Sequence, residues 1–239
     1  MNDKLSAEAV LEDQELIKKF LKETTLFLGP DQEIMQSHDI MPITDYEAEA
    51  VKKFNDPHQM SSIRDRMQSA CDESYEMLEQ MGAAPGAKWG DVITGIYSAS
   101  GDLTIGSAGG VLIFNVVVHH PIKFIIKNWI DEHTVGLKQG DGFIHNDSRY
   151  GNVHNTDQSM IMPIFHEGEL IAWVASTVHE GENGAIEPGG MPSMAETPFD
   201  EGLKMSPFRV VENYEIKRDL LTFLQNSVRE PKLQYEDMK

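Results

Sequence analysis

Three residues, His154, Asp157 and His179, have the side-chain types and spacing of a site for a divalent metal ion. Seven of the nine histidines lie between His119 and His179, so imidazole nitrogen is concentrated in one part of the chain. Two imidazoles and a carboxylate suit Mn, Fe or Zn and leave coordination positions open for a substrate. On a straight strand His154 and Asp157 would face opposite ways, so a shared ion requires a turn between them, which Gly151 favours. The alternative interpretation is that these are loop histidines hydrogen-bonded to the backbone.

A β-hairpin is expected to bring these three side chains together. Residues 160–165 and 170–175 are rich in apolar residues and are separated by a turn-like tetrapeptide, a pattern typical of two paired strands. His154 and Asp157 precede the first strand, and His179 follows the second. Because the second strand of a hairpin runs back along the first, its two ends lie side by side, and no contact between distant parts of the sequence has to be assumed. The sequence therefore predicts a metal site at the open end of this hairpin.

Further acidic and basic groups lie beside the three predicted ligands. His145 and Asp147 are candidates for a fourth ligand or for a residue that orients a ligand. Glu180, Glu182 and Glu187 follow His179 in the sequence and could supply a general base. In a chain this acidic, we expect these three glutamates to be solvated loop charges.

The bulk composition indicates a soluble globular protein. The chain has 239 residues, 40% of them hydrophobic and 25% charged, which allows a sizeable core. Its formal net charge of −19 disfavours nucleic acids and anionic membranes as partners. The single cysteine, Cys71, excludes an intramolecular disulfide and favours a reducing compartment. The N-terminus lacks a signal-peptide pattern, and the longest apolar stretch, 111–118, is too short to cross a bilayer, so we expect a cytoplasmic protein with no membrane partner.

The sequence predicts an α+β fold in two regions: a helical N-terminal lead and arm at 1–90, and a sheet-rich region at 91–239 that carries the metal site. Helical periodicity in the lead begins at Ser6 and ends at Gly29-Pro30, and a second helix is expected over 63–81. Residues 31–60 show no sustained period, and we expect an irregular arm there.

The second region is predicted to have a core of β-hairpins with peripheral helices. In addition to the hairpin at the metal site, its expected elements are a hairpin formed by 92–97 and 103–105, a strand buried on both faces at 111–118, a helix at 121–130, a long loop at 180–198 and a helix at 214–228. Residues 101–107 have glycine spacing similar to that of a phosphate-binding loop, but they lack the lysine and lie between strands. We therefore expect any ATP chemistry to take place on another chain.

Several short motifs lie around the predicted metal site and before it in the chain. They are Gly-Asp-x-Phe-x-x-Asn-Asp at 140–147, Tyr-Gly-x-x-His-x-x-Asp at 150–157, Gly168-Glu169-Leu170, His179, Pro188-Gly189-Gly190, Glu201-Gly202-Leu203, Pro207 and the Val-His-His-Pro-Ile-Lys segment at 118–123. In their order and spacing, these motifs resemble those of the hydantoinase B/oxoprolinase family. Within that family, the long helical lead and the segment at 118–123 are most similar to the alpha subunits of acetone carboxylases.

The resemblance implies an ATP-dependent carboxylation of acetone to acetoacetate that uses bicarbonate or CO2. It implies a hetero-oligomer in which the alpha subunit works with beta and gamma subunits and the beta subunit handles ATP. It also implies that His154, Asp157 and His179 hold a Mn2+ ion, or another divalent metal. Because members of this family run to several hundred residues, we expect this chain to be an incomplete, N-terminal part of the domain.

Two alternatives to a carboxylase remain open from the sequence. The first is an amide or lactam ring hydrolase of the hydantoinase or 5-oxoprolinase type, in which the metal would activate water. The second is a non-catalytic, truncated remnant.

Overall fold

The computed structural model describes residue 11 and residues 14–19, 29–37, 39–54 and 56–239. The chain divides into two units, Met1–Pro30 and Asp31–Lys239. Within the first unit, residue 11 and residues 14–19 are helical, in agreement with the predicted N-terminal helix, and most of the remainder of that helix lies outside the described residues. The boundary between compact units at residue 30 does not test the predicted division at residue 90, which stays a prediction.

The second unit opens with helices rather than with the predicted irregular arm. Its first four helices are α2 (Gln32–Gln36), α3 (Asp45–Lys53), α4 (Pro57–Met81) and α5 (Pro85–Lys88). The prediction for 31–60 was wrong because it overlooked local capping signals. Thr44 and Glu47 form a capping box at the start of α3, and Asp56 caps α4 just before Pro57 at its first position. The predicted second helix is confirmed as α4, which begins before residue 63.

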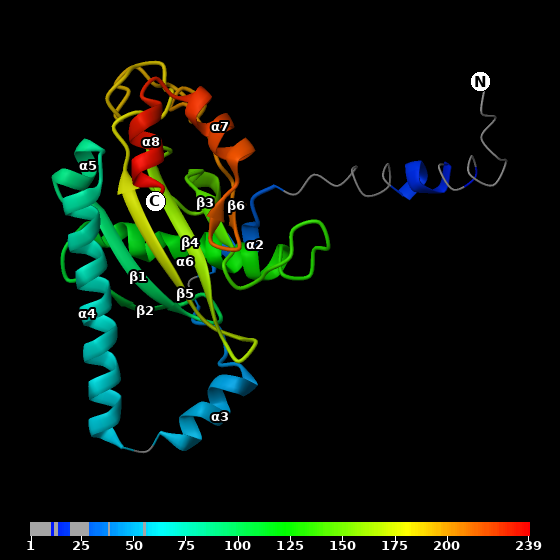
Figure 1. Cartoon of the computed structure of the whole chain (residues 1–239), viewed down its shortest axis with the longest axis vertical. Coiled ribbons are helices and arrows are strands. Elements are labelled where there is room, and N and C mark those ends of the chain that lie inside the picture. Colours follow the sequence, from blue (N-terminus) through cyan, green and yellow to red (C-terminus); the bar gives the residue numbers. More distant parts are fainter. Residues whose placement is uncertain (1–10, 12–13, 20–28, 38, 55) are drawn as a thin grey trace. The chain divides into compact units, whose positions relative to one another are not determined.

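A seven-stranded antiparallel sheet forms the centre of the unit and confirms the α+β class (Figure 1). The strand order is β2-β1-β5-β4-β3-β6-β7. The strands are β1 (Val92–Ser98), β2 (Leu103–Gly106), β3 (Gly142–His145), β4 (Asp157–His166), β5 (Glu169–His179), β6 (Phe208–Glu212) and β7 (Glu215–Ile216). Both predicted hairpins are present, as β1–β2 and β4–β5, whereas β3, β6 and β7 were not predicted.

Residues 112–128 form one continuous helix, α6 (Leu112–Asn128), and not the predicted strand followed by a helix. Its buried residues recur at helical spacing, with Phe114, Val118, Ile122 and Ile125 facing inward. Val116, which would share a face with Val118 on a strand, is exposed. The β-branched run at 111–118 is therefore helical from Leu112 on, because a helix buries one of its faces against the sheet and leaves the other face exposed. As a consequence, His119 and His120 lie on a helix and do not end a strand.

A buried polar residue ties α6 to the sheet. The Asn115 side-chain amide donates to the Thr94 carbonyl over 2.9 Å, and the Tyr97 hydroxyl lies 3.0 Å from the Asn115 carbonyl oxygen. Asn115 is 1% exposed, so these hydrogen bonds satisfy polar groups that burial would otherwise leave unpaired. This anchor explains why an asparagine interrupts the longest apolar run of the sequence.

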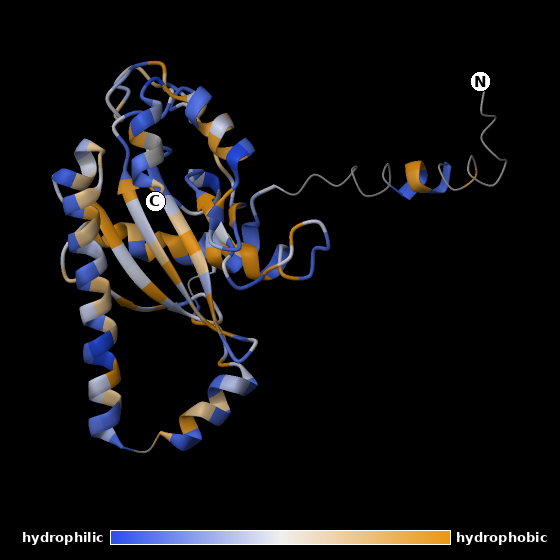
Figure 2. Ribbon diagram, viewed as in Figure 1, coloured by the Kyte–Doolittle hydropathy of each residue, from blue (hydrophilic) through white to orange (hydrophobic). Residues whose placement is uncertain are grey.

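The main apolar core lies between α6 and the central strands. Figure 2 shows α6 and the middle of the sheet as a concentration of apolar residues. The buried residues of this core are Tyr97, Val118, Ile122, Ile125, Phe143, Ile161, Trp173 and Ala175. Two smaller cores pack α4 and α5 against β1 and β5, and α7 (Arg218–Ser227) and α8 (Pro231–Asp237) against β3 and β6. The cores thus hold β4 and β5, the strands that carry Asp157 and His179, from both sides.

The C-terminal part follows the predictions closely but not fully. Residues 180–198 contain no helix or strand, as expected for a long loop. The predicted helix at 214–228 begins only at Arg218, because Asn213 and Tyr214 have φ values of 52° and 62° and form the tight turn between β6 and β7. Within the described residues, no helix combines the length and the apolar character needed to cross a bilayer.

Candidate metal centre

The side chains of His154, Asp157 and His179 meet at the open end of the β4–β5 hairpin. Asp157 begins β4 and His179 ends β5, and the two residues are direct cross-strand partners. The Nδ1 atom of His179 lies 3.0 Å from Asp157 Oδ1, and the Nε2 atom of His154 lies 3.3 Å from the same oxygen. One possible ligand atom from each residue lies within 4.8 Å of the others. The structure therefore brings all three predicted residues together.

A turn before β4 gives His154 and Asp157 a common direction. The Asp157 amide donates to the His154 carbonyl over 3.2 Å, so the chain reverses between the two residues. The Asn152 side-chain amide lies 2.7 Å from the His154 carbonyl oxygen and 2.6 Å from the Asp157 carbonyl oxygen. Asn152 is buried, and it fixes the backbone on both sides of the turn. This local geometry supplies the turn that the spacing of the two residues required.

The carboxylate of Asp157 is buried, charged and only half satisfied. Its side chain is fully buried, and Oδ2 has no hydrogen-bond partner among the described residues. Burial by itself would raise the pKa of Asp157, but the hydrogen bonds from His154 and His179 outweigh it and hold the pKa below its usual value. A buried anionic oxygen without a partner is costly unless a cation or a donor completes it. This orphaned oxygen, beside two imidazoles, fits a divalent metal ion.

His154 takes its electrostatic character from the same aspartate. The hydrogen bond to Asp157 is the main cause that raises the pKa of His154, and burial opposes it. The rings of His154 and His179 have centroids 5.0 Å apart and lie at 45° to each other. The two rings therefore flank the carboxylate from two directions, as the ligands of one ion do.

A second carboxylate, Asp91, lies at the edge of the centre and was missed from the sequence. Its Oδ2 atom is 3.9 Å from His179 Nδ1, and its side chain is 39% exposed. Burial raises the pKa of Asp91, and the nearby charge of Asp157 acts in the same direction. The residue immediately precedes β1, which pairs with the end of β5, and only that strand pairing reveals its position.

The two spare candidates do not join the centre. Asp147 accepts from Arg149, with Nη2 and Oδ2 separated by 2.7 Å, and it caps the short 3-10 helix η1 (Ser148–Tyr150). His145 is fully buried, and its Nε2 atom lies 3.2 Å from the Gly151 carbonyl oxygen. Burial lowers the pKa of His145 to about 4, so it is a neutral ring inside the fold.

Two of the three glutamates after His179, Glu180 and Glu182, are not the solvated loop charges that the sequence suggested, whereas Glu187 accepts hydrogen bonds from its own exposed loop. Glu180 and Glu182 are 4% and 7% exposed. Glu182 accepts from Arg229 Nη1 over 2.8 and 3.0 Å. Glu180 is hydrogen-bonded to Asp237, and burial together with that carboxylate raises the pKa of Glu180 well above its usual value. Both side chains are thus engaged by the C-terminal helices, and not by the metal centre.

The loop after β5 closes over His179. Gly190 has a φ of 76°, and a Cβ at this position would lie 2.8 Å from His179 Nε2. The Thr156 hydroxyl donates to the Gly190 carbonyl over 2.7 Å and holds the loop in place. Only glycine combines this backbone conformation with the close approach to the imidazole.

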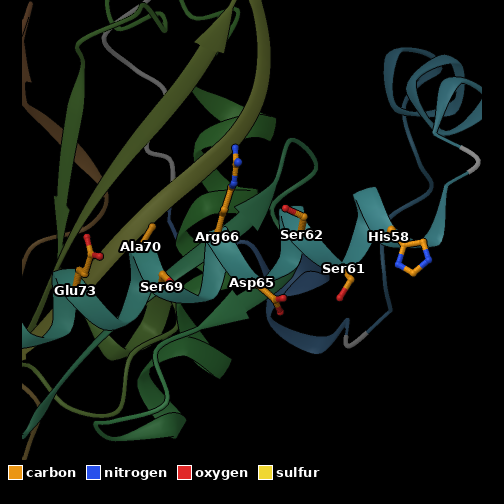
Figure 3. Close-up of a pocket in the computed structure, with 8 residues that line it drawn as sticks. All are labelled: His58, Ser61, Ser62, Asp65, Arg66, Ser69, Ala70 and Glu73. Atoms are coloured by element: carbon orange, nitrogen blue, oxygen red, sulfur yellow. The ribbon is translucent and has the colours of Figure 1, made fainter.

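A separate groove of about 500 Å³ lies along α4 (Figure 3). Figure 3 shows that its lining side chains all come from this one helix. The lining residues are His58, Ser61, Ser62, Asp65, Arg66, Ser69, Ala70 and Glu73. None of them belongs to the metal centre, so the groove is not part of that site.

Comparison with known proteins finds one matching family model and relatives that are named as carboxylase subunits. Residues 56–239 match the family model described as hydantoinase B/oxoprolinase. The chain is 37% identical over 185 residues to the acetophenone carboxylase delta subunit of Aromatoleum aromaticum, an alignment that covers 77% of this chain and 26% of the relative. It is 32% identical over 176 residues to the acetone carboxylase alpha subunit of Xanthobacter autotrophicus, which covers 73% of this chain and 22% of the relative.

A solved structure shares the fold. The nucleotide-free structure of acetone carboxylase superposes with a TM-score of 0.72 at 31% identity, over 77% of this chain and 24% of that chain. The chain therefore spans about a quarter of the length of these relatives. Because the family model matches most of the chain, the chain belongs to the hydantoinase B/oxoprolinase family.

Proposed function

We propose that this chain is part of the metal-binding subunit of an ATP-requiring carboxylase of a small ketone, and that His154, Asp157 and His179 hold a Mn2+ ion. In this proposal, the substrates are bicarbonate or CO2 and a ketone of the acetone kind, which acetone carboxylase would convert to acetoacetate. ATP is handled by a partner subunit, and beta and gamma subunits complete the enzyme. The relatives support this assignment, since both are named as subunits of ketone carboxylases.

The observation that carries the proposal is the buried carboxylate of Asp157. Two imidazole nitrogens share its Oδ1 atom, and its Oδ2 atom has no hydrogen-bond partner among the described residues. Nitrogen and carboxylate oxygen ligands suit Mn2+ and other borderline divalent ions, and three protein ligands leave positions for substrate. A bound ion would supply Lewis-acid stabilisation of the negative charge that develops on the carboxylation substrate.

The residues of the chain would prepare the site for that chemistry. Asp157 orients both rings, because a single oxygen lies within hydrogen-bond reach of His154 and of His179. The backbone at Gly190 covers the Nε2 side of His179. Asp91 lies on the more open side with a raised pKa, and its carboxylate is the group available to hold a proton beside the substrate.

An amide or lactam ring hydrolase is the second candidate function, supported by the oxoprolinase part of the family description. The same donor set would then serve to activate water. A non-catalytic remnant is the third possibility, and it predicts that the purified chain takes up no metal.

Two measurements test the proposal. Metal analysis of the purified chain after incubation with Mn2+ is expected to give about one ion per chain in wild type and a large loss in Asp157→Asn. After reconstitution with the partner subunits, acetone or acetophenone is expected to cause bicarbonate-dependent ATP consumption. Ring opening of a lactam without bicarbonate would instead favour the hydrolase, and absence of metal uptake would favour the remnant.

A further inference from the structure

We propose that Asp237, on the C-terminal helix α8, is a positioning residue for the metal centre. Its carboxylate holds Glu180 and the turn before α5, and these in turn fix the strand ends that carry Asp91 and His179. The inference rests on the proposed metal-binding function. It adds that the packing of α8 against the rest of the fold determines how accurately the proposed metal ligands are positioned.

The Asp237 carboxylate makes contacts to two distant parts of the chain. Its Oδ1 accepts from the Ala83 amide over 2.5 Å, and its Oδ2 accepts from the Ala84 amide over 2.8 Å. Ala84 is the residue that precedes α5 and has no side chain able to satisfy these amides. Asp237 also shares a hydrogen bond with Glu180, the residue after His179. One carboxylate thus joins α8 to both segments.

From this turn, the backbone leads directly to the metal centre. Gly86 of α5 packs so closely on β5 that a Cβ there would lie 2.1 Å from the His179 carbonyl oxygen. The Asp91 amide donates to the Gly86 carbonyl over 2.8 Å, and the His179 amide donates to the Asp91 carbonyl over 2.9 Å. Any movement of α5 is therefore transmitted to the two residues through one packing contact and two hydrogen bonds.

An ion pair also anchors the C-terminal segment to the loop after β5. Arg229, between α7 and α8, donates to both oxygens of Glu182 and to the Ala185 carbonyl. The two buried acids after His179, Glu180 and Glu182, thus each have a partner from the C-terminal helices. Buried carboxylates placed in this way are expensive to leave unpaired, so undocking of α8 would disturb the end of β5.

The functional consequence follows from the tolerance of a metal site. Ligands must be held within about 0.5 Å of the productive geometry by the groups behind them. Loss of such a supporting group typically weakens metal binding about 10- to 100-fold while the ligands themselves stay in the chain. We therefore expect a change at Asp237 to act on metal affinity, although its side chain contacts no predicted ligand side chain.

The test compares Asp237→Ala with Glu236→Gln in the full 239-residue chain. Glu236 is the exposed neighbour on α8, so the control removes the same charge from the same helix. The first readout is the dissociation constant of Mn2+, measured by electron paramagnetic resonance of the free ion. We expect it to rise at least about 10-fold in Asp237→Ala and to stay unchanged in Glu236→Gln. The resonance of the bound ion at saturation should also broaden or shift only in Asp237→Ala.

Two further variants separate positioning from a general loss of stability. Ile122→Val changes a residue of α6 that is buried in the main core, and it should lower the melting temperature without changing the Mn2+ dissociation constant. If Asp237→Ala does not fold, Asp237→Asn replaces it, because the amide keeps one acceptor oxygen and opposes the second backbone donor with an NH2 group. An unchanged Mn2+ affinity in the folded Asp237 variant would overturn the inference.

Hydrogen exchange without metal makes the two proposals separable. Asp237→Ala should speed the exchange of the amides of Asp91 and His179, while Glu236→Gln should not. Wild type that binds no Mn2+ would remove the proposed function, and faster exchange in Asp237→Ala would then still establish that α8 holds the end of β5. Wild type that binds Mn2+, combined with equal exchange and equal affinity in both variants, would remove this inference alone.

Discussion

Asp157 and His179 occupy directly opposed positions on neighbouring strands, and their side chains meet at 3.0 Å between Oδ1 and Nδ1. The pair is therefore a product of strand register as much as of side-chain chemistry. A slip of one residue between β4 and β5 would turn one partner to the other face of the sheet. The β4–β5 ladder continues from this pair to His166 and Glu169, and its pairing fixes the register that brings the two side chains together.

Replacement of Asp157 by asparagine should abolish most metal binding. The change keeps the shape of the side chain and removes the charge that both imidazoles face, so we expect the Mn2+ affinity to fall by more than about 100-fold. Added Mn2+ should raise the melting temperature of wild type and not that of the variant.

The matched control for this change is Asp147→Asn, which removes another buried aspartate. Asp147 is paired with Arg149 and lies outside the three-residue group. We expect an unchanged Mn2+ affinity here even if stability falls. Equal loss of affinity in the two variants would contradict the assignment of the ligands. Isothermal titration calorimetry distinguishes the outcomes.

Gly190→Ala should weaken metal binding by moving the His179 ring. The new methyl group would lie 2.8 Å from Nε2 and 2.6 Å from the Glu180 carbonyl oxygen, so the loop or the ring must shift. Gly189→Ala is the control, since Gly189 also has a positive φ, 101°, but no atom lies within 4 Å of its Cβ position. Both variants carry the backbone strain of a left-handed alanine. Only Gly190→Ala should raise the Mn2+ dissociation constant, and the same rise in both variants would assign the effect to backbone strain instead.

Val118→Ala and Val116→Ala test the helical state of α6. On a strand these residues would share a face, and the two variants would have similar effects. In the helix Val118 is fully buried and Val116 is 47% exposed. We expect the free energy of unfolding to fall by about 2 kcal/mol for Val118→Ala, and to change by less than about 0.5 kcal/mol for Val116→Ala, because alanine is a good helix former. Urea denaturation of the two proteins measures the difference.

Acid should destabilise the fold through His145. Burial lowers the pKa of this residue from 6.5 to about 4, so the folded protein keeps it neutral while the unfolded chain protonates it near pH 6.5. The unfolded state thus binds the extra proton, and stability falls as the pH drops from about 6.5 to about 4. The cost is on the order of 3 kcal/mol.

Urea unfolding at pH 7.5, 6 and 5 measures this dependence, and His145→Gln should remove this part of it. Glutamine can still donate to the Gly151 carbonyl but cannot take up a proton in this range. A pH dependence of equal size in the variant would assign the acid sensitivity to other groups.

The meeting of His154, Asp157 and His179 could be predicted from the sequence because its geometry is local. The two apolar runs at 160–165 and 170–175, with a turn-like tetrapeptide between them, identified the hairpin, and the ends of a hairpin must meet. The capping residues of α3 and α4 are equally local signals. The irregular arm predicted at 31–60 was wrong because these signals were not used, although the sequence contains them.

Other features depend on contacts between segments that are distant in the sequence, and no short sequence pattern predicts them. Asp91 reaches the candidate centre because β1 pairs with β5, and Asp237 reaches the turn before α5, where it accepts hydrogen bonds from the Ala83 and Ala84 amides. The segment 112–128 has a composition that favours a strand, and it is a helix because its apolar stripe packs on the sheet, where Asn115 is hydrogen-bonded to β1. Local propensity loses to tertiary packing at such positions.

The two-residue turn at Glu167 and Gly168 joins β4 and β5 at the end opposite the ligands. Along β4 it is roughly 30 Å from Asp157, at about 3.3 Å per residue. No atom lies within 4 Å of a Cβ built on Gly168. A fluorescent reporter or an affinity tag attached at this tip would therefore leave His154, Asp157 and His179 undisturbed, so labelled protein can be used to test for assembly with the proposed partner subunits.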